Sequence, residues 1–224
     1  MNHVDQSRLP KNQLRKLKWG SSTHINNSVI SAFPITGVLE LGAGLNSTPL
    51  FFDKVPHVIS VEADLNWITK LRETISETTN QRIVHHRLPD TITRATPRKQ
   101  IPSNIKNNAL VLYRSVMNEH LNYLFVDCYG GFRLSAMTEL YHDFDVIAYH
   151  DAEPNMDKYY GYSEFQSGDD FYHLTDKTFL VHTGILISKK LADFLPTFKQ
   201  TLEVKAQEYA NKFGVTHKFT LVEH

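Results

Sequence analysis

Short apolar runs alternate with amphipathic segments along the chain from residue 37 onward. Runs rich in β-branched residues predict strands at 37–41, 58–61, 82–86, 123–126 and 145–149. Between them, apolar residues at helical spacing predict helices at 65–76, 109–120 and 134–141. Apolar strands separated by helices are typical of parallel strands buried on both faces, so the pattern predicts a doubly wound α/β sheet.

The two ends of the chain complete this prediction. Residues 1–36 form an expected N-terminal helical extension, with helices at 11–18 and around 25–32. Beyond the fifth strand we predict an antiparallel pair at 171–174 and 179–188, turning at Asp176-Lys177, then a long helix over about 189–213 and a last strand at 218–222. We therefore expect one mostly parallel seven-stranded sheet with an antiparallel strand pair near the C-terminus.

Two stretches interrupt the alternation of strands and helices. Residues 89–108 are polar and contain three prolines, which predicts a loop or lid. Residues 154–170 carry four aromatic side chains among Gly, Ser and Asp. These aromatic residues either line an acceptor pocket or pack as surface loop, and the sequence leaves both readings open.

Composition changes this picture little. A net charge of zero over 224 residues suggests no general affinity for a polyanion. A local basic cluster near the N-terminus is predicted to be a solvated helix face, with a substrate contact as the alternative; its members are Arg8, Lys11, Arg15, Lys16 and Lys18. The single cysteine, Cys128, excludes an intramolecular disulfide. With no signal peptide and no apolar run of about 20 residues, we expect a soluble cytoplasmic protein.

Candidate chemistry lies where the predicted strands end, because open parallel sheets bind ligands beyond the carboxyl ends of their strands. The first strand leads into Gly42 and Gly44, which allow a sharp turn and a close ligand approach. Glu40 precedes them and would repel a pyrophosphate but attract a cation such as S-adenosylmethionine. Ser47 stands where a dinucleotide fingerprint has its third glycine, which opposes the alternative of an NAD-dependent oxidoreductase.

A second acid extends the nucleoside interpretation. Glu62 follows Gly44 by 18 residues and ends the second predicted strand. This spacing suits a carboxylate that accepts hydrogen bonds from both ribose hydroxyls. A strand, an acid, two glycines, a helix, a strand and a terminal acid therefore predict a nucleoside-binding βαβ unit.

These segments resemble the Rossmann-type (class I) S-adenosylmethionine-dependent methyltransferases. Glu40-Leu41-Gly42-Ala43-Gly44, followed by Asn46-Ser47-Thr48, is similar to their first motif, in a branch whose loop reads Gly-x-Gly-x-Ser-Thr. Val61–Asp64 resembles the ribose-binding motif, and Val84–Pro89 resembles the segment that passes near the adenine. Phe125–Asp127 with Gly130, Gly131 and Arg133 resembles the fourth-strand motif, and Val146–Asp151 resembles the end of the fifth strand. Cys128-Tyr129 stand where the branch has Gly-Pro, and the insertion at 89–108 is also a departure.

The resemblance implies a Rossmann-like methyltransferase domain over 37–224 and S-adenosylmethionine as cofactor. The implied cofactor-binding residues are Glu40, Gly42, Ala43, Gly44, Asn46, Ser47, Thr48, Glu62, Ala63, Arg87, Leu88 and Asp127. Asp127, His150 and Asp151 are expected to converge as catalytic residues, with His150 suited to a general base. We expect no metal; the alternative is a Mg²⁺ ion held by the carboxylates of Asp127 and Asp151, with or without His150.

The expected reaction is O-methylation of a small-molecule or sugar-like acceptor. The chain lacks the Asn/Asp-Pro-Pro-aromatic element of amino-methylating nucleic-acid enzymes, and no proline precedes Cys128 as a cytosine-C5 nucleophile would require. With a neutral net charge, no nucleic acid is favoured as a partner; no membrane partner is expected, and a homodimer stays open. The altered loop at Cys128-Tyr129 motivates one alternative, a non-catalytic or scaffolding relative that binds S-adenosylmethionine.

Overall fold

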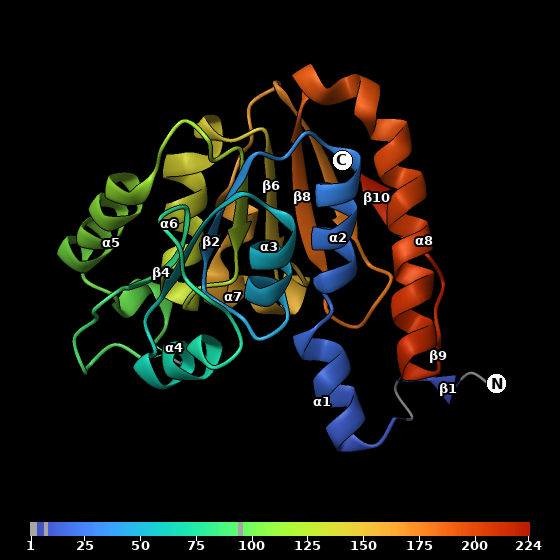
Figure 1. Ribbon diagram of the computed structural model, residues 1–224, viewed down its shortest axis with the longest axis horizontal. Helices are drawn as coiled ribbons and strands as arrows, with labels where there is room; N and C mark the ends of the chain where they lie inside the picture. Colours follow the sequence, from blue (N-terminus) through green and yellow to red (C-terminus); the bar gives the residue numbers. More distant parts are fainter. Residues whose placement is uncertain (1–3, 7–8, 94–95) are drawn as a thin grey trace.

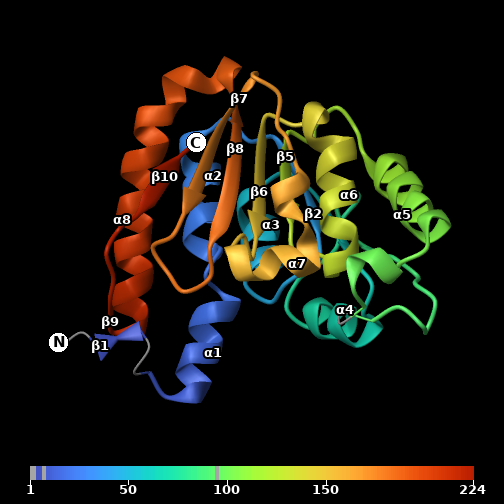
Figure 2. The same ribbon diagram turned by 180° about the vertical axis from the view of Figure 1, so that it is seen from behind.

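The computed structural model describes residues 4–6, 9–93 and 96–224. An eight-stranded sheet in the order β10-β7-β8-β6-β5-β2-β3-β4 forms its centre, with helices on both faces (Figures 1 and 2). Its strands are β2 (Gly37–Leu41), β3 (His57–Glu62), β4 (Gln81–His85), β5 (Tyr123–Val126), β6 (Val146–His150), β7 (Phe171–Asp176), β8 (Thr183–Ser188) and β10 (Leu221–Glu223). Two short strands, β1 (Val4–Asp5) and β9 (Val215–Thr216), pair separately.

The order of the strands places the candidate chemistry. β2 to β6 are parallel, whereas β8 runs antiparallel to both β6 and β7, and β10 runs antiparallel to β7. From β2 the chain moves outward through β3 to β4 and then returns to β5 on the other side of β2. The carboxyl ends of β2 and β5 therefore flank the topological switch point, where ligands of open α/β sheets bind.

Helices cover the two faces of the sheet and enclose two cores. The helices are α1 (Lys11–Trp19), α2 (Thr23–Ala32), α3 (Ser47–Lys54), α4 (Leu65–Arg72), α5 (Ser103–Val116), α6 (Gly130–Leu140), α7 (Asp157–Tyr160) and α8 (Leu195–Phe213). Residues of α2, α3 and α8 pack on one face, which receives Val38, and residues of α5 and α6 pack on the other, which receives Leu39 and Leu41. Because β2 is buried on both faces, it holds the loop that follows it rigidly.

The predicted fold class is confirmed, but the predicted count of seven strands was wrong, since the main sheet has eight. The last strand predicted at 218–222 is β10, Leu221–Glu223, which lies at the sheet edge beside β7 and is the eighth strand. The described residues 89–93 and 96–102 form a loop with one 3-10 turn, and α5 begins at Ser103. Two side chains of this loop, Ile92 and Ile101, are buried in the core. The helix expected over 189–213 divides into a 3-10 segment, Lys189–Phe194, and α8, whose first turn contains Pro196.

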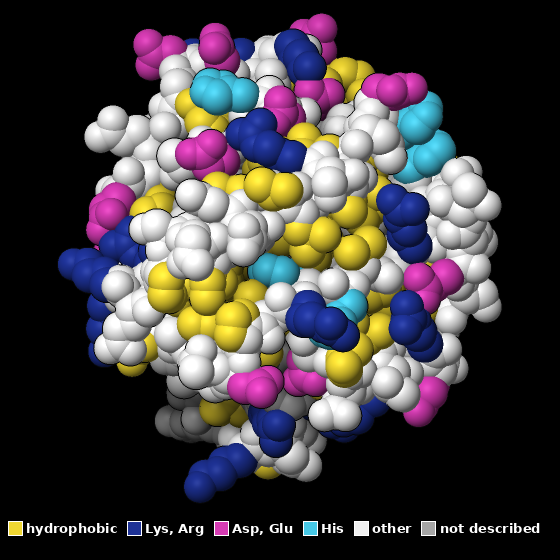
Figure 3. Space-filling model, turned by 90° about the vertical axis from the view of Figure 1, so that its left-hand side faces the viewer, with side chains coloured by type: hydrophobic (Ala, Val, Ile, Leu, Met, Phe, Trp, Pro, Cys, Tyr) yellow, Lys and Arg dark blue, Asp and Glu magenta, His cyan; other side chains and the backbone are white. Residues whose placement is uncertain are grey.

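The surface has an exposed apolar area over two of the helices. The face that carries α4 and α5, shown in Figure 3, exposes apolar side chains bordered by Lys and Arg; Val111 of α5 is 66% exposed. Among the described residues, no helix is both long and apolar enough to cross a membrane.

Candidate cofactor and active site

The loop after β2 packs directly on the loop after β5. Gly42 has a φ of +93°, and a Cβ there would lie 2.4 Å from the carbonyl carbon of Asp127. Both backbones are tied to strands, since Gly42 N–H donates to the Val61 carbonyl at 2.8 Å and Asp127 N–H donates to the Leu41 carbonyl at 2.7 Å. Glycine is therefore required at position 42 by both its conformation and its surroundings.

The rest of this loop closes onto the first turn of α3. Thr48 Oγ1 accepts a hydrogen bond from Gly44 N–H at 2.9 Å, and Thr48 N–H donates to the Gly44 carbonyl at 3.0 Å. A Cβ at Gly44 would meet Ser47 Oγ at 2.8 Å. Gly42–Thr48 thus forms a compact cradle at a helix N-terminus, where backbone N–H groups lack helical partners.

Glu40 lies beneath this cradle. Its side chain is completely buried, and its Oε2 accepts hydrogen bonds from Thr48 Oγ1 at 2.7 Å and from Ser60 Oγ. Oε1 is buried without a hydrogen-bond partner among the described residues. Burial raises the pKa of Glu40 to about 7, although three hydroxyl groups lower it. Glu40 therefore joins β2, β3 and α3, and its hydrogen bonds are structural.

Replacing Glu40 by glutamine should change how stability depends on pH. The folded pKa of about 7 lies above the ordinary 4.5, so the folded protein binds the proton more tightly than the unfolded chain. The contribution of Glu40 to stability is therefore largest below pH 4.5 and falls as the pH rises to 7, by about 3 kcal/mol in total. Urea denaturation between pH 5 and 8 should show this slope in the native chain and lose it in Glu40→Gln; equal slopes would contradict it.

The end of β3 is joined to the same loop. Glu62 is buried, and its Oε1 accepts hydrogen bonds from the N–H groups of Ala63 and Asp64, both at 2.8 Å. Asp64 caps α4 through the N–H groups of Asn66 and Trp67. Trp67 Nε1 in turn donates to the Ala43 carbonyl at 2.7 Å. The two predicted nucleoside-binding segments are therefore one rigid unit.

The segment after β4 presents a less uniform set of side chains. Arg87 is exposed, whereas Leu88 is half-buried and packs against the core. His86 is buried between the rings of Tyr113 and Phe132. Burial lowers the pKa of His86 to about 4, so its imidazole is neutral. Of the predicted pair, Leu88 thus offers an apolar surface and Arg87 a solvent-exposed charge.

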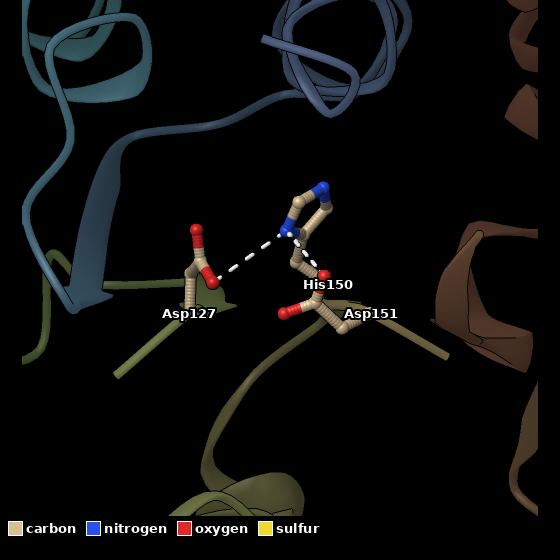
Figure 4. A group of neighbouring side chains, drawn as sticks. All are labelled: Asp127, His150 and Asp151. Atoms are coloured by element: carbon tan, nitrogen blue, oxygen red, sulfur yellow. Dashed lines mark ion pairs between the residues drawn. The ribbon is translucent and has the colours of Figure 1, made fainter. Parts of the chain in front are cut away.

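The structure brings together Asp127, His150 and Asp151 (Figure 4). His150 Nδ1 lies 3.5 Å from Asp127 Oδ1 and 3.6 Å from Asp151 Oδ1. Asp151 has a φ of +59°, which is unusual for a residue other than glycine and marks a strained site. Burial lowers the pKa of His150, but the two carboxylates more than offset it and leave the pKa above its usual value.

Arg133 holds both carboxylates and was not predicted as a site residue. This buried guanidinium donates to Asp127 Oδ1 at 2.7 Å, to Asp151 Oδ2 at 3.0 Å and to the His150 carbonyl at 2.8 Å. Its Nε also donates to the Cys128 carbonyl at 2.7 Å. The arginine in the fourth-strand motif was the signal available. Burial raises the pKa of the Cys128 thiol to about 12, so this residue is no nucleophile.

Three further side chains complete the cluster. The Tyr160 ring covers the Arg133 guanidinium at 4.2 Å, and its hydroxyl donates to Asp151 Oδ2 at 3.1 Å. The Tyr162 hydroxyl donates to the His150 carbonyl at 3.1 Å. Ser21 Oγ lies 2.8 Å from His150 Nε2. The aromatic segment thus supports the site, and no sequence signal linked Ser21 to a residue 129 positions away.

Comparison with known proteins identifies the fold of this chain. The sequence matches no protein-family model and no curated protein. Among solved structures, an rRNA methylase from Streptococcus thermophilus is 9% identical, with 73% of this chain and 93% of that chain covered and a TM-score of 0.50. A protein from Haemophilus influenzae classed as a methylase is 15% identical, with 79% of this chain and 97% of that chain covered and a TM-score of 0.43. A dimethyladenosine transferase from Plasmodium falciparum is 16% identical, with 76% of this chain and 63% of that chain covered and a TM-score of 0.37. The chain has the fold of class I S-adenosylmethionine-dependent methyltransferases.

The comparison also corrects the expected acceptor. We expected a small molecule and favoured no nucleic acid, but the rRNA methylase shows that this fold serves a nucleic-acid methylase. A zero net charge was a poor guide because it sums over the whole chain. Residues 6–39 hold five Lys or Arg and no Asp or Glu. Four of the five are exposed on α1, and Arg8 lies outside the described residues.

Proposed function

We propose that this chain is an S-adenosylmethionine-dependent methyltransferase with its active site at the switch point between β2 and β5. The observation that carries the proposal is the contact at Gly42, which joins the candidate cofactor loop to the loop that bears Asp127. His150 ends β6, the strand next to β5. The candidate nucleoside-binding segments therefore lie at the same end of the sheet as Asp127, His150 and Asp151, which we call the reactive cluster. A bound cofactor and an acceptor at this edge would be neighbours.

The residues present suit S-adenosylmethionine. The Gly42–Gly44 backbone and the first turn of α3, with Asn46, would hold its methionine part, and Asp127 lies beside them. Glu62 and Ala63 would hold the ribose, and Leu88 with Arg87 would flank the adenine. Glu40, whose Oε1 has no hydrogen-bond partner among the described residues, would place negative charge beneath the cradle when it ionises above its pKa of about 7, and that charge suits a cation. This cofactor supplies a methyl group on a positively charged sulfur atom.

The protein's own contribution is positioning and proton removal. An attacking hydroxyl must lose its proton, and a fixed carboxylate is a suitable acceptor for it. Asp127 and Asp151 are partly exposed, with 33% and 22% of their side chains accessible, and Arg133 fixes both. We therefore propose a hydroxyl oxygen as the target and these carboxylates, together with His150, as the catalytic group.

We propose RNA as the acceptor. The exposed residues Lys11, Lys16 and Lys18 lie on α1, and the chain that leaves α1 reaches His150 through Ser21. A basic surface next to an active site suits a phosphodiester backbone, which binds through Lys and Arg. The rRNA methylase that shares the fold supports this choice of acceptor.

Calorimetry tests the cofactor assignment. Titration with S-adenosylmethionine and S-adenosylhomocysteine should show binding, whereas NAD should not bind. Glu62→Ala should weaken sulfur-ligand binding at least tenfold, because the ribose hydroxyls lose their acceptor. Glu73→Ala, an exposed acid at the end of α4, is the control and should bind as the native chain does. Binding of NAD alone would overturn the proposal.

The same preparations test the acceptor with radiolabelled cofactor. Label should enter RNA, and nucleoside digestion should recover it on a hydroxyl oxygen. A Lys11→Glu, Lys16→Glu, Lys18→Glu variant should lose most transfer and keep its cofactor affinity. Lys189→Glu with Lys190→Glu, on the segment that precedes α8, reverses two charges away from α1 and is the control. Label that enters DNA or protein instead would overturn RNA as acceptor. Cofactor binding without transfer to any macromolecule would favour the scaffolding alternative.

A further inference from the structure

The tautomer of His150 follows from its contact with Ser21. The Ser21 hydroxyl has one proton, which it donates to the Lys18 carbonyl at 2.8 Å. At the 2.8 Å contact with His150 Nε2 the serine oxygen must therefore accept. Nε2 carries a hydrogen, so the lone pair of a neutral His150 ring is on Nδ1.

When the His150 ring is neutral, three lone-pair-bearing atoms therefore face one another at the ends of β5 and β6. Nδ1 points toward Asp127 Oδ1 and Asp151 Oδ1, and a ligand atom from each residue lies within 4.8 Å of the other two (Figure 4). His150 is only 6% exposed. The two aspartates are partly exposed, and Arg133 compensates one of their two negative charges, so the converging acceptors still favour a further cation.

We propose that Asp127, His150 and Asp151 bind a divalent transition-metal ion, with Mn²⁺ as the representative probe. One imidazole nitrogen and two carboxylate oxygens form a mixed donor set that suits such ions, whereas Mg²⁺ prefers oxygen ligands alone. Binding of the ion does not depend on the proposed methyltransferase function, but the role that we assign to the ion does. In a methyltransferase, the ion would hold the acceptor oxygen and make its proton more acidic.

The surroundings of the three side chains match those of metal ligands. A ligating histidine donates its second N–H to a fixed acceptor, and ligating carboxylates are themselves hydrogen-bonded. Ser21 Oγ accepts the hydrogen bond from His150 Nε2, and Arg133 donates hydrogen bonds to both aspartates. The strained backbone of Asp151 turns its carboxylate toward His150. Ser21 and Arg133 are accordingly positioning residues.

The charge count identifies one competitor for the site. Two carboxylates and the Arg133 guanidinium together leave one negative charge. A proton on Nδ1 would neutralise it, whereas a divalent ion would make the cluster positive and draw in an ionised acceptor oxygen. A direct measurement of metal binding separates these two occupants.

Calorimetry and electron paramagnetic resonance with Mn²⁺ on the full chain, without cofactor, test the proposal. One ion per chain should bind, and Asp151→Asn and His150→Gln should each weaken binding at least 100-fold. Ser21→Ala should weaken it by about 10- to 100-fold, as loss of a supporting contact does elsewhere. Asp143→Asn, an exposed acid between α6 and β6, should bind as the native chain does.

Two results would overturn the metal site. One is a folded native chain that binds neither Mn²⁺ nor Zn²⁺ at millimolar concentration. The other is a nitrogen NMR spectrum in which both His150 nitrogens stay protonated when metal is added. Since binding is read without cofactor, failure to bind S-adenosylmethionine would sink the proposed function and leave the metal result intact.

Discussion

Gly42→Ala should lower the free energy of unfolding by about 4 kcal/mol, because two separate costs meet at this position. A φ of +93° is unfavourable for alanine by about 1–2 kcal/mol. The new Cβ would also lie 2.4 Å from the carbonyl group of Asp127 and 2.5 Å from Cys128 N, all of them backbone atoms. To remove this clash, the two loops would have to separate, which would break their hydrogen bonds to β2 and β3.

Gly214→Ala is the matched control for this prediction. Gly214 ends α8 with a φ of +62°, but a Cβ there would meet nothing within 4 Å. The control should therefore lose only the conformational cost, about 1 kcal/mol. Urea denaturation of both variants measures the difference. Equal losses would show that the contact between the two loops does not constrain position 42.

The difference between these two glycines illustrates what sequence can predict. The strand before Gly42 and the turn after it were predictable because apolar periodicity and glycine are local signals. The close approach of Asp127 was not, since it depends on the pairing of β2 with β5, more than 80 residues apart in the chain. Sequence therefore located the loop, and only the fold explains why alanine should fail there.

Glu40 shows a second limit of sequence reasoning. An acid just before a glycine loop suggests a side chain that faces the ligand. Strand residues alternate between faces, however, and β2 places Glu40 on the same side as Val38, under α3. Its contacts are therefore structural.

The polar segment 89–108, predicted as a loop or lid, shows a third limit, because its last residues belong to α5 and its loop is anchored in the core. Its composition is dominated by polar residues and proline, which hides the two apolar side chains that anchor it. Ile101 packs where a Cβ on Gly131 would lie, 2.0 Å away. Isolated buried residues such as Ile101 anchor this segment, and no periodicity reports such contacts.

Arg133→Met should cost about 3–5 kcal/mol of stability and abolish any methyl transfer. The arginine side chain is 6% exposed and donates to two carboxylates and two backbone carbonyls. Removal of one partner from a buried ion pair leaves the remaining charges uncompensated, which costs more than the pair contributes in total. Arg133→Lys should recover little, because one ammonium group cannot reproduce the planar arrangement of donors.

The comparison with Arg114 isolates the effect of burial. Arg114 pairs with Glu139 at 3.4 Å, but about half of each side chain is exposed. Arg114→Met should change the unfolding free energy by less than about 1 kcal/mol, since solvent screens such pairs. Urea denaturation and radiolabel transfer should be measured on both variants. If Arg133→Met were as mild as Arg114→Met in both measurements, the carboxylates would not depend on the guanidinium, and the assignment of Arg133 as the residue that holds the reactive cluster would fail.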